Sequence, residues 1–167
     1  TVSNSGKLTV DNQLILFRNG TSSLNFDNQD TVSVSQLAFS NGGSATDLVL
    51  DMTAADAAFY IQEPITLSGA ATITSDPVNT SSFFYNGTSA QTFTHVPTFT
   101  FHDLIIDNAS GVSLNSDLPA TALLGDLIIN DGAILNTQGN NISLNQNFIS
   151  NGSGDLEMNA TDTITFS

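Results

Sequence analysis

The sequence contains no cysteine and no tryptophan, and its only cations are Lys7 and Arg18. Without cysteine the chain can form no disulfide, no thiolate nucleophile and no zinc site built on thiolates. Nucleic-acid binding needs clustered lysine and arginine to displace phosphate counterions, and binding to an anionic membrane surface has the same need. With 16 carboxylates and a formal net charge of −14, we expect neither partner.

Long apolar runs are also missing, whereas a transmembrane helix needs about 20 consecutive apolar residues. The chain does not open on a basic segment followed by an apolar one, so any export signal lies further upstream or has been removed. The composition is rich in Ser, Thr, Asn and Gly, and only 11% of the residues are charged, against about 25% in typical domains. This composition predicts a secreted protein or one displayed on the cell surface.

The apolar residues indicate one β-rich domain over residues 1–167. They make up 40% of the chain, enough to bury a core. They alternate with polar residues at a period of two, which is the pattern of β-strands. Only the alanine-rich segment 51–60 leaves a single helical turn open, beside strand or loop.

Short apolar segments recur along the chain at intervals of 21 to 24 residues, and most are followed closely by Asn, Asp or Gly. This first series begins at Leu14, Leu37, Phe59, Phe83, Leu104, Leu127 and Phe148. A second series contains Leu24, Leu48, Ile65, Phe93, Val112, Leu135 and Leu156, and a third contains Leu8, Val32, Ile73, Phe99, Leu118, Ile142 and Ile164. Three short strands in each repeat predict a right-handed parallel β-helix, a three-sided solenoid of about seven coils of roughly 22 residues.

A solenoid explains how such a repeat can bury its apolar side chains and form sharp corners. One coil cannot bury its inward side chains alone, whereas coils stacked about 4.8 Å apart close a continuous core. Asn and Gly tolerate the left-handed backbone of a sharp corner, and stacked Asn side chains can hydrogen-bond along the axis. An antiparallel β-sandwich or jelly roll stays open as the alternative, because it also places turns every 8–12 residues or so.

From Phe83 onward the amino-acid sequence also resembles a known repeat. The matching segments are FFYNGTSAQTF at 83–93, FHDLIIDNASGVSLNSDLP at 101–119, GDLIINDGAILNTQGNNISL at 125–144 and NGSGDLEM at 151–158. They resemble the repeat region of large secreted surface and adhesin-like β-solenoid proteins of Bacteroidetes and related bacteria. The resemblance covers the C-terminal half best. It implies a stalk, spacer or adhesin, and it carries over no catalytic residue.

Two carboxylates form a candidate functional site. Asp103 and Asp126 occupy the same phase one coil apart, and two carboxylates stacked in this way repel unless a cation or a shared proton lies between them. A weak Ca²⁺ site, a glycosidase-like pair and two solvated corner residues are the alternatives. His102, beside Asp103, is the nearest candidate general base. We assign no catalytic residue, no metal ligand beyond these two weak candidates and no cofactor other than that calcium ion.

Four asparagines at the repeated corner begin Asn-x-Ser/Thr triplets and are candidate glycosylation sites in an exported chain. They are Asn19, Asn86, Asn108 and Asn151.

These observations favour a non-enzymatic extracellular solenoid that serves as a structural or adhesive unit of a surface protein or self-assembling fibre. Its expected partners are neighbouring copies or adjoining segments that meet its open ends, and surface glycans. The alternative is a polysaccharide-binding or polysaccharide-cleaving module that uses carboxylates on one face.

Overall fold

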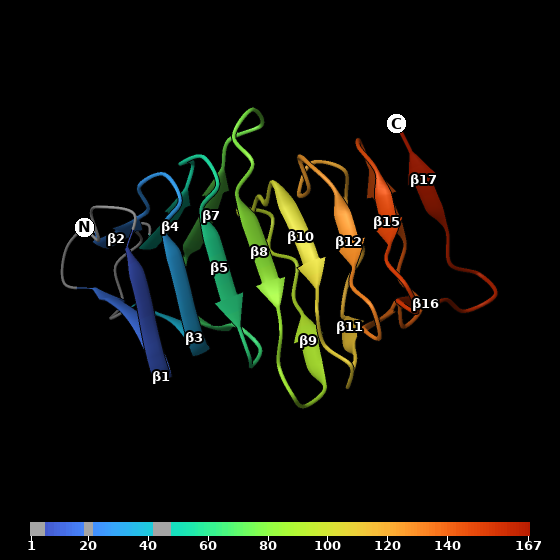
Figure 1. The fold of residues 1–167 in the computed structure, drawn as a ribbon, viewed down its shortest axis with the longest axis horizontal. Helices are drawn as coiled ribbons and strands as arrows, with labels where there is room; N and C mark the ends of the chain where they lie inside the picture. Colours follow the sequence, from blue (N-terminus) through green and yellow to red (C-terminus); the bar gives the residue numbers. More distant parts are fainter. Residues whose placement is uncertain (1–5, 19–21, 42–47) are drawn as a thin grey trace.

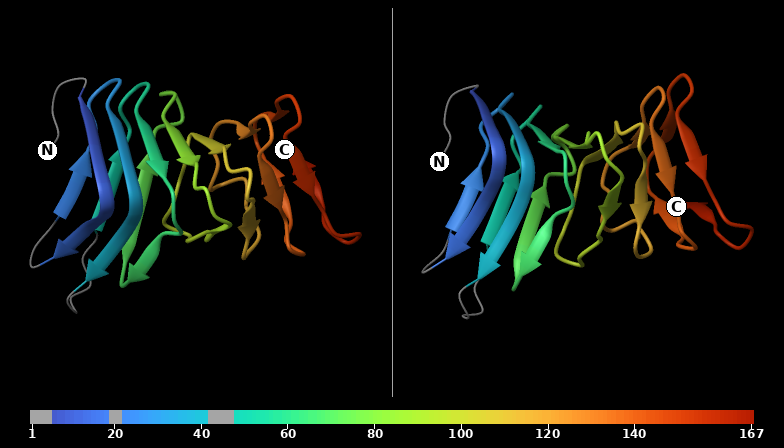
Figure 2. Two further views of the ribbon diagram at one scale, coloured as in Figure 1. Left: turned by 60° about the horizontal axis from the view of Figure 1, so that its bottom comes forward. Right: turned by 90° about the horizontal axis from the view of Figure 1, so that it is seen from below.

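A computed structural model describes residues 6–18, 22–41 and 48–167, and within them the chain winds into a parallel β-solenoid of about six turns (Figure 1). Every pairing between its named strands is parallel, which confirms the predicted β-helix and rules out the antiparallel sandwich. Figure 2 shows the coils side by side, with the first (blue) and last (red) coils at opposite ends. Within these residues no helix is long and apolar enough to cross a membrane.

The strands form three walls. The first wall contains β1 (Lys7–Arg18), β3 (Thr31–Asn41), β5 (Ala58–Ile61), β8 (Ser82–Tyr85), β10 (Asp103–Ile106), β12 (Leu127–Ile129) and β15 (Phe148–Ser150), and β6 (Thr66–Ser68) also pairs with β3. The second wall contains β9 (Gln91–Phe93), β11 (Val112–Leu114), β13 (Ile134–Asn136) and β16 (Asp155–Glu157). The third contains one sheet of β2 (Ser22–Asn25), β4 (Leu48–Met52) and β7 (Ala71–Ser75) and another of β14 (Ile142–Leu144) and β17 (Ile164–Phe166). Single bridges extend them, from Ile73 of β7 to Phe99 and from Ile142 of β14 to Leu118.

The first two strands of the first wall are long because each turns a corner without ending. β1 has 12 residues and β3 has 11, and the register between them shifts between Val10 and Gln13. The first part of β3 pairs with β5 and the second part pairs with β6. Phe59 therefore lies beside Val32, so the predicted alignment of Phe59 with Leu37 was wrong.

From Phe83 to the C-terminus the predicted alignment of the first series was correct, whereas in the third series Phe101 bridges Leu123 and not the predicted Leu118. Leu104 pairs with Phe83 on one side and with Leu127 on the other. Leu127 in turn pairs with Phe148. The segment 51–60, where helix, strand and loop were open, contains the end of β4, a turn at Asp56 with φ of 57°, and the start of β5.

Inward side chains fill the solenoid with a continuous apolar core. Aromatic rings dominate its middle, where Phe59 stacks on Phe83 with ring centroids 5.1 Å apart. Phe83 also meets Phe101 edge to face, and Tyr85 meets Phe93 in the same way at 5.6 Å. Complete burial of such a side chain contributes about 1.5–3 kcal/mol, so these rings contribute substantially to the stability of the core.

Polar side chains form ladders along the corners. Asn130 Nδ2 donates to Asp107 Oδ1 at 3.0 Å, and Asn151 Nδ2 donates to Asn130 Oδ1 at 3.3 Å. This column confirms the expectation that corner asparagines bond along the axis. Gly152 is required beside it, because its φ is 55° and a Cβ there would lie 2.4 Å from Asp131 Oδ1.

Tyr85 has a hydroxyl that is buried in the core and has no hydrogen-bond partner among the residues that the structure describes. Such a group loses its bonds to water and gains none, so Tyr85→Phe is expected to raise the free energy of unfolding by about 1 kcal/mol. Urea unfolding of both proteins measures the difference. Phe83→Ala, which empties space beside the same ring, is the control and is expected to cost about 3–5 kcal/mol. A Tyr85→Phe protein less stable than the wild type would contradict this assignment.

Candidate functional site

Asp103 and Asp126 lie one above the other at a corner of the first wall. Asp103 is the first residue of β10, and Asp126 directly precedes β12. The pairing of Leu104 with Leu127 places the two aspartates in adjacent coils, as the sequence predicted. Gly125 permits this approach, because a Cβ at that position would lie 2.3 Å from Asp103 Oδ1.

Each carboxylate accepts hydrogen bonds from the next coil. The backbone N–H of Asp126 donates to Asp103 Oδ1 at 2.9 Å, and His102 Nδ1 lies 3.0 Å from the same oxygen. One coil further on, the backbone N–H and the side-chain Nδ2 of Asn147 both donate to Asp126 Oδ1 at 3.0 Å. The two aspartates thus form a ladder of carboxylate-to-backbone bonds along the axis.

A polar groove of about 350 Å³ surrounds this ladder, and Thr80 and Gln146 also line it. Among the residues that the structure describes, no group of three or more His, Cys, Asp or Glu side chains is placed to hold a metal ion. Lys7 lies on β1, four strands away from β10 in the order of the sheet. The arrangement therefore provides a His102–Asp103 pair and two carboxylates that already bind protein donors.

The four candidate glycosylation sites lie in different environments. Asn108 is fully buried, and its Nδ2 donates to Ser89 O and Gln91 Oε1 at 2.8 Å each, so the folded chain does not present this nitrogen to solvent. Asn86 is half-buried, and its Oδ1 has no partner in the described structure. Asn151 is exposed in the corner ladder. Asn19 lies outside the described residues.

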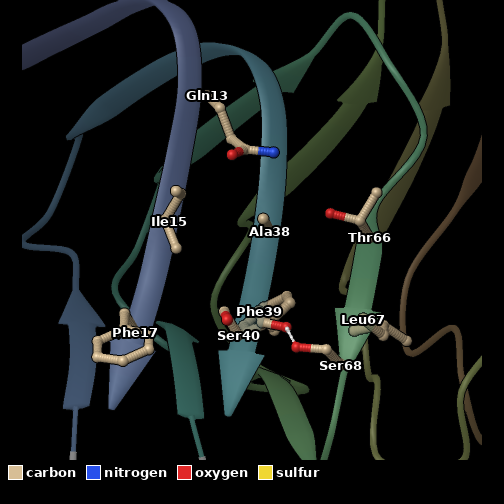
Figure 3. A pocket seen from close by; sticks show the side chains of 9 residues that line it. All are labelled: Gln13, Ile15, Phe17, Ala38, Phe39, Ser40, Thr66, Leu67 and Ser68. Atoms are coloured by element: carbon tan, nitrogen blue, oxygen red, sulfur yellow. Dashed lines mark hydrogen bonds between the residues drawn. The ribbon is translucent and has the colours of Figure 1, made fainter. Parts of the chain in front are cut away.

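A second hollow lies on the outer face of β1, β3 and β6 and was not predicted from the sequence (Figure 3). We call it the outer groove and define it by its volume of about 430 Å³ and its nine lining residues: Gln13, Ile15, Phe17, Ala38, Phe39, Ser40, Thr66, Leu67 and Ser68.

Three exposed apolar side chains line the outer groove. Ile15 is 50% exposed, Phe17 is 59% exposed and Leu67 is 38% exposed. The sequence did contain a signal for them. The run Leu14–Phe17 is apolar at every position, so it cannot turn all its side chains inward, and a strand alternates its two faces.

Two further aspartates bind neighbouring coils at corners. Asp131 Oδ1 accepts from the backbone and the hydroxyl of Ser153 at 2.8 Å each, and these bonds hold the pKa of its carboxyl below the usual value. The Asp162 carboxylate accepts from the Thr137 hydroxyl and from the backbone N–H of Asn159, and its pKa is lowered, mainly by the Thr137 bond. Both bonding patterns favour the ionised side chain.

Removal of the Asp126 carboxylate shows which effect on stability is larger, the hydrogen bonds of the ladder or the repulsion between the two stacked carboxylates. If the ladder dominates, Asp126→Ala leaves the Asn147 N–H without its acceptor and lowers the free energy of unfolding by about 1–2 kcal/mol. Asp155→Ala removes the same charge from an exposed carboxylate with no side-chain hydrogen bond in the described structure, and a change within about 0.5 kcal/mol is expected. Urea unfolding measures both. A more stable Asp126→Ala protein would mean that repulsion dominates.

Asp162 predicts a dependence of stability on pH. Because its pKa is lowered in the folded state, its contribution is fully present above the ordinary value of 3.8 and is lost as the pH falls through the folded value. Asp162→Asn removes this ionisation, so its melting temperature is expected to fall less steeply than that of the wild type between about pH 4 and pH 2. Thermal unfolding at several pH values tests this. An unchanged slope in Asp162→Asn, with Asp155→Asn as control, would contradict it.

Comparison of the chain with protein-family models gives no match. Comparisons with curated proteins and with solved structures also give none.

Proposed function

We propose that the chain is a non-enzymatic structural unit of an extracellular surface protein or fibre, and that it forms one segment of a longer stack of coils. The observation that carries this proposal is the condition of the last coil. Its inward side chains have the same apolar character as those of the interior coils, but no other coil of the described residues covers them.

Residues that pair between the last two coils show how much less the last coil is buried. Leu144 and Phe166 occupy the same column in adjacent coils, and Leu144 is fully buried whereas Phe166 is 61% exposed. Leu135 is fully buried, and its partner Leu156 in the last coil is only partly buried. Met158, next to that strand, is 40% exposed. One more coil of the same kind would cover all three of these side chains.

The strands at this end also have one unpaired edge. β15, β16 and β17 are each the last strand of their sheets, so their outer N–H and C=O groups face no strand of the described chain. Unpaired edges of this kind recruit further strands, and each newly buried apolar side chain adds about 1.5–3 kcal/mol. At the opposite end, along the outer edge of β1, Leu8 and Val10 are likewise only partly buried. The two ends are therefore suited to meet each other.

The ladder of Asp103 and Asp126 supports a structural role over a polysaccharide-cleaving one. A glycoside hydrolase needs one carboxyl group to donate a proton and a second to act as base or nucleophile. Here both carboxylates accept backbone N–H groups of the next coil, which is a contribution to stacking. A polar, acidic exterior with few cations suits a rod that stays soluble outside the cell.

End-to-end stacking can be tested on the purified chain by sedimentation velocity and electron microscopy. We expect unbranched filaments of constant width whose formation increases with protein concentration. Salt is expected to favour them, because it screens the repulsion between copies that each carry a formal charge of −14.

Two variants of equal charge identify the interface. Phe166→Asp places a carboxylate on the inward face of the last coil and is expected to abolish filaments. Val78→Asp adds the same charge at a position that is 83% exposed, away from both ends, and is expected to leave them unchanged. Monomers at every salt and protein concentration, or filaments that tolerate Phe166→Asp, would refute stacking through this end.

A further inference from the structure

We propose that the outer groove on β1, β3 and β6 is a binding site for an uncharged glycan. This inference goes beyond the stacking role and does not rest on it. Stacking uses the strand edges at the two ends of the rod, those of β15, β16 and β17 and that of β1. The outer groove instead lies on the outward face of β1, β3 and β6, so a ligand can occupy it without pairing with a strand edge.

The pairing of three strands gives the groove its shape. β3 lies between β1 and β6, and the register aligns Ile15 with Ala38 and Ala38 with Thr66. Adjacent strands are about 4.8 Å apart, so the two flanking strands are about 10 Å apart across the groove. Because the middle row carries the small side chains of Ala38 and Ser40, the groove is open along β3. Its volume of about 430 Å³ is within the usual range of about 300–1,000 Å³ for small-ligand sites.

The groove combines exposed apolar side chains, which include Leu67 on β6, with hydroxyl groups. The β1 side presents the exposed apolar side chains of Ile15 and Phe17. On the β6 side the Thr66 hydroxyl points toward β3 (Figure 3). The hydroxyls of Thr66 and Ser40 make no hydrogen bond within the described residues, so they can bond to a ligand. A sugar ring has this combination of an apolar C–H face and an edge of hydroxyl groups.

An amide pair closes one end of the groove. Gln13 Nε2 donates to Gln36 Oε1, and this bond holds the Gln13 side chain at the end of the groove away from Ser40. The Gln13 carbonyl oxygen can still accept a hydrogen bond from a sugar hydroxyl, since an amide oxygen has two lone pairs and an amide nitrogen has two protons.

Charge selects a neutral ligand. None of the nine residues that line the groove is charged, although the chain carries 16 carboxylates and a formal charge of −14. The field of the whole protein repels acidic glycans such as polyuronates. Docking of a second copy on this face would bring two chains of formal charge −14 together without the unpaired strand edges that favour end-to-end stacking.

The groove differs from the other exposed apolar positions among the described residues. Val78 is in the loop between β7 and β8, and Met158 and Phe166 belong to the last coil. The outward rings of Tyr60 and Phe84 stack on each other at 4.1 Å, so each covers one face of the other. The outer groove is therefore the place where exposed apolar area and hydroxyl groups occur together on the wall of the rod.

Calorimetry and NMR titration of the full chain test the proposal. The probes are the neutral hexasaccharides of cellulose, laminarin, starch and xylan, and polygalacturonate is the acidic comparison. We expect at least one neutral hexasaccharide to bind and to shift resonances of β1, β3 and β6, and no binding of polygalacturonate. Phe17→Ser is expected to weaken the neutral interaction by about tenfold or more, which is typical for truncation of an aromatic anchor.

Two further variants test whether the ligand binds in the outer groove. Ser40→Phe fills the middle of the groove and is expected to abolish binding, while its far-ultraviolet circular dichroism stays that of the wild type. Val78→Ser removes a more exposed apolar side chain elsewhere and is expected to bind as the wild type does. Three results would overturn the proposal: no neutral probe binds, binding survives both Phe17→Ser and Ser40→Phe, or Phe17→Ser dissolves a dimer and so places a second copy in the groove.

Discussion

Each coil of this protein buries its inward side chains only against the coils on either side of it. Leu127 and Leu135 are fully buried because a coil follows them, and their partners in the last coil, Phe148 and Leu156, are only partly buried because none does. Burial is thus a property of neighbouring pairs of coils. In such a fold, stability is approximately a sum of coil and interface terms along one axis, and the ends are the weakest points.

The polar residues obey the same constraint. A corner has backbone N–H groups that the sheets do not use, and acceptors in the preceding coil bind several of them: Asp103 binds the N–H of Asp126, and Asp126 binds the N–H of Asn147. Asn130 and Asn151 continue this pattern between side chains. Many of the carboxylates that make the chain acidic are therefore part of what holds the coils together. These hydrogen bonds give acidic residues at the corners a role in stacking.

The sequence was sufficient to predict the architecture, and its C-terminal half in register, because Leu104, Leu127 and Phe148 recur with regular spacing and each is followed by a corner residue. It failed at Phe59, which pairs with Val32. β1 and β3 pass through a corner as continuous strands, so no turn residue marks that corner in the sequence. Without that signal, two segments at nearly equal spacing could not be distinguished.

The candidate sites were predictable to different degrees. The stacking of Asp103 on Asp126 followed from their common phase, but the donors that bind them are backbone groups, which leave no mark in a sequence. The outer groove depends on which strand lies on each side of β3. These strands are β1 and the short strand β6, and the sequence spacing had placed the β6 segment in the second series. The apolar run through Ile15 and Phe17 was visible, whereas its outward neighbours Ala38 and Thr66 could be recognised only in three dimensions.

Amide hydrogen exchange of the intact chain measures the central claim most directly, because it reports local opening along the axis. If burial and hydrogen bonding come from neighbouring coils, the slowest amides will be those of β8, β10 and β12 in the middle of the rod. Protection will then decrease stepwise toward β1 and toward β15, β16 and β17. Equal protection in all coils, or the slowest exchange in the last coil, would contradict this account.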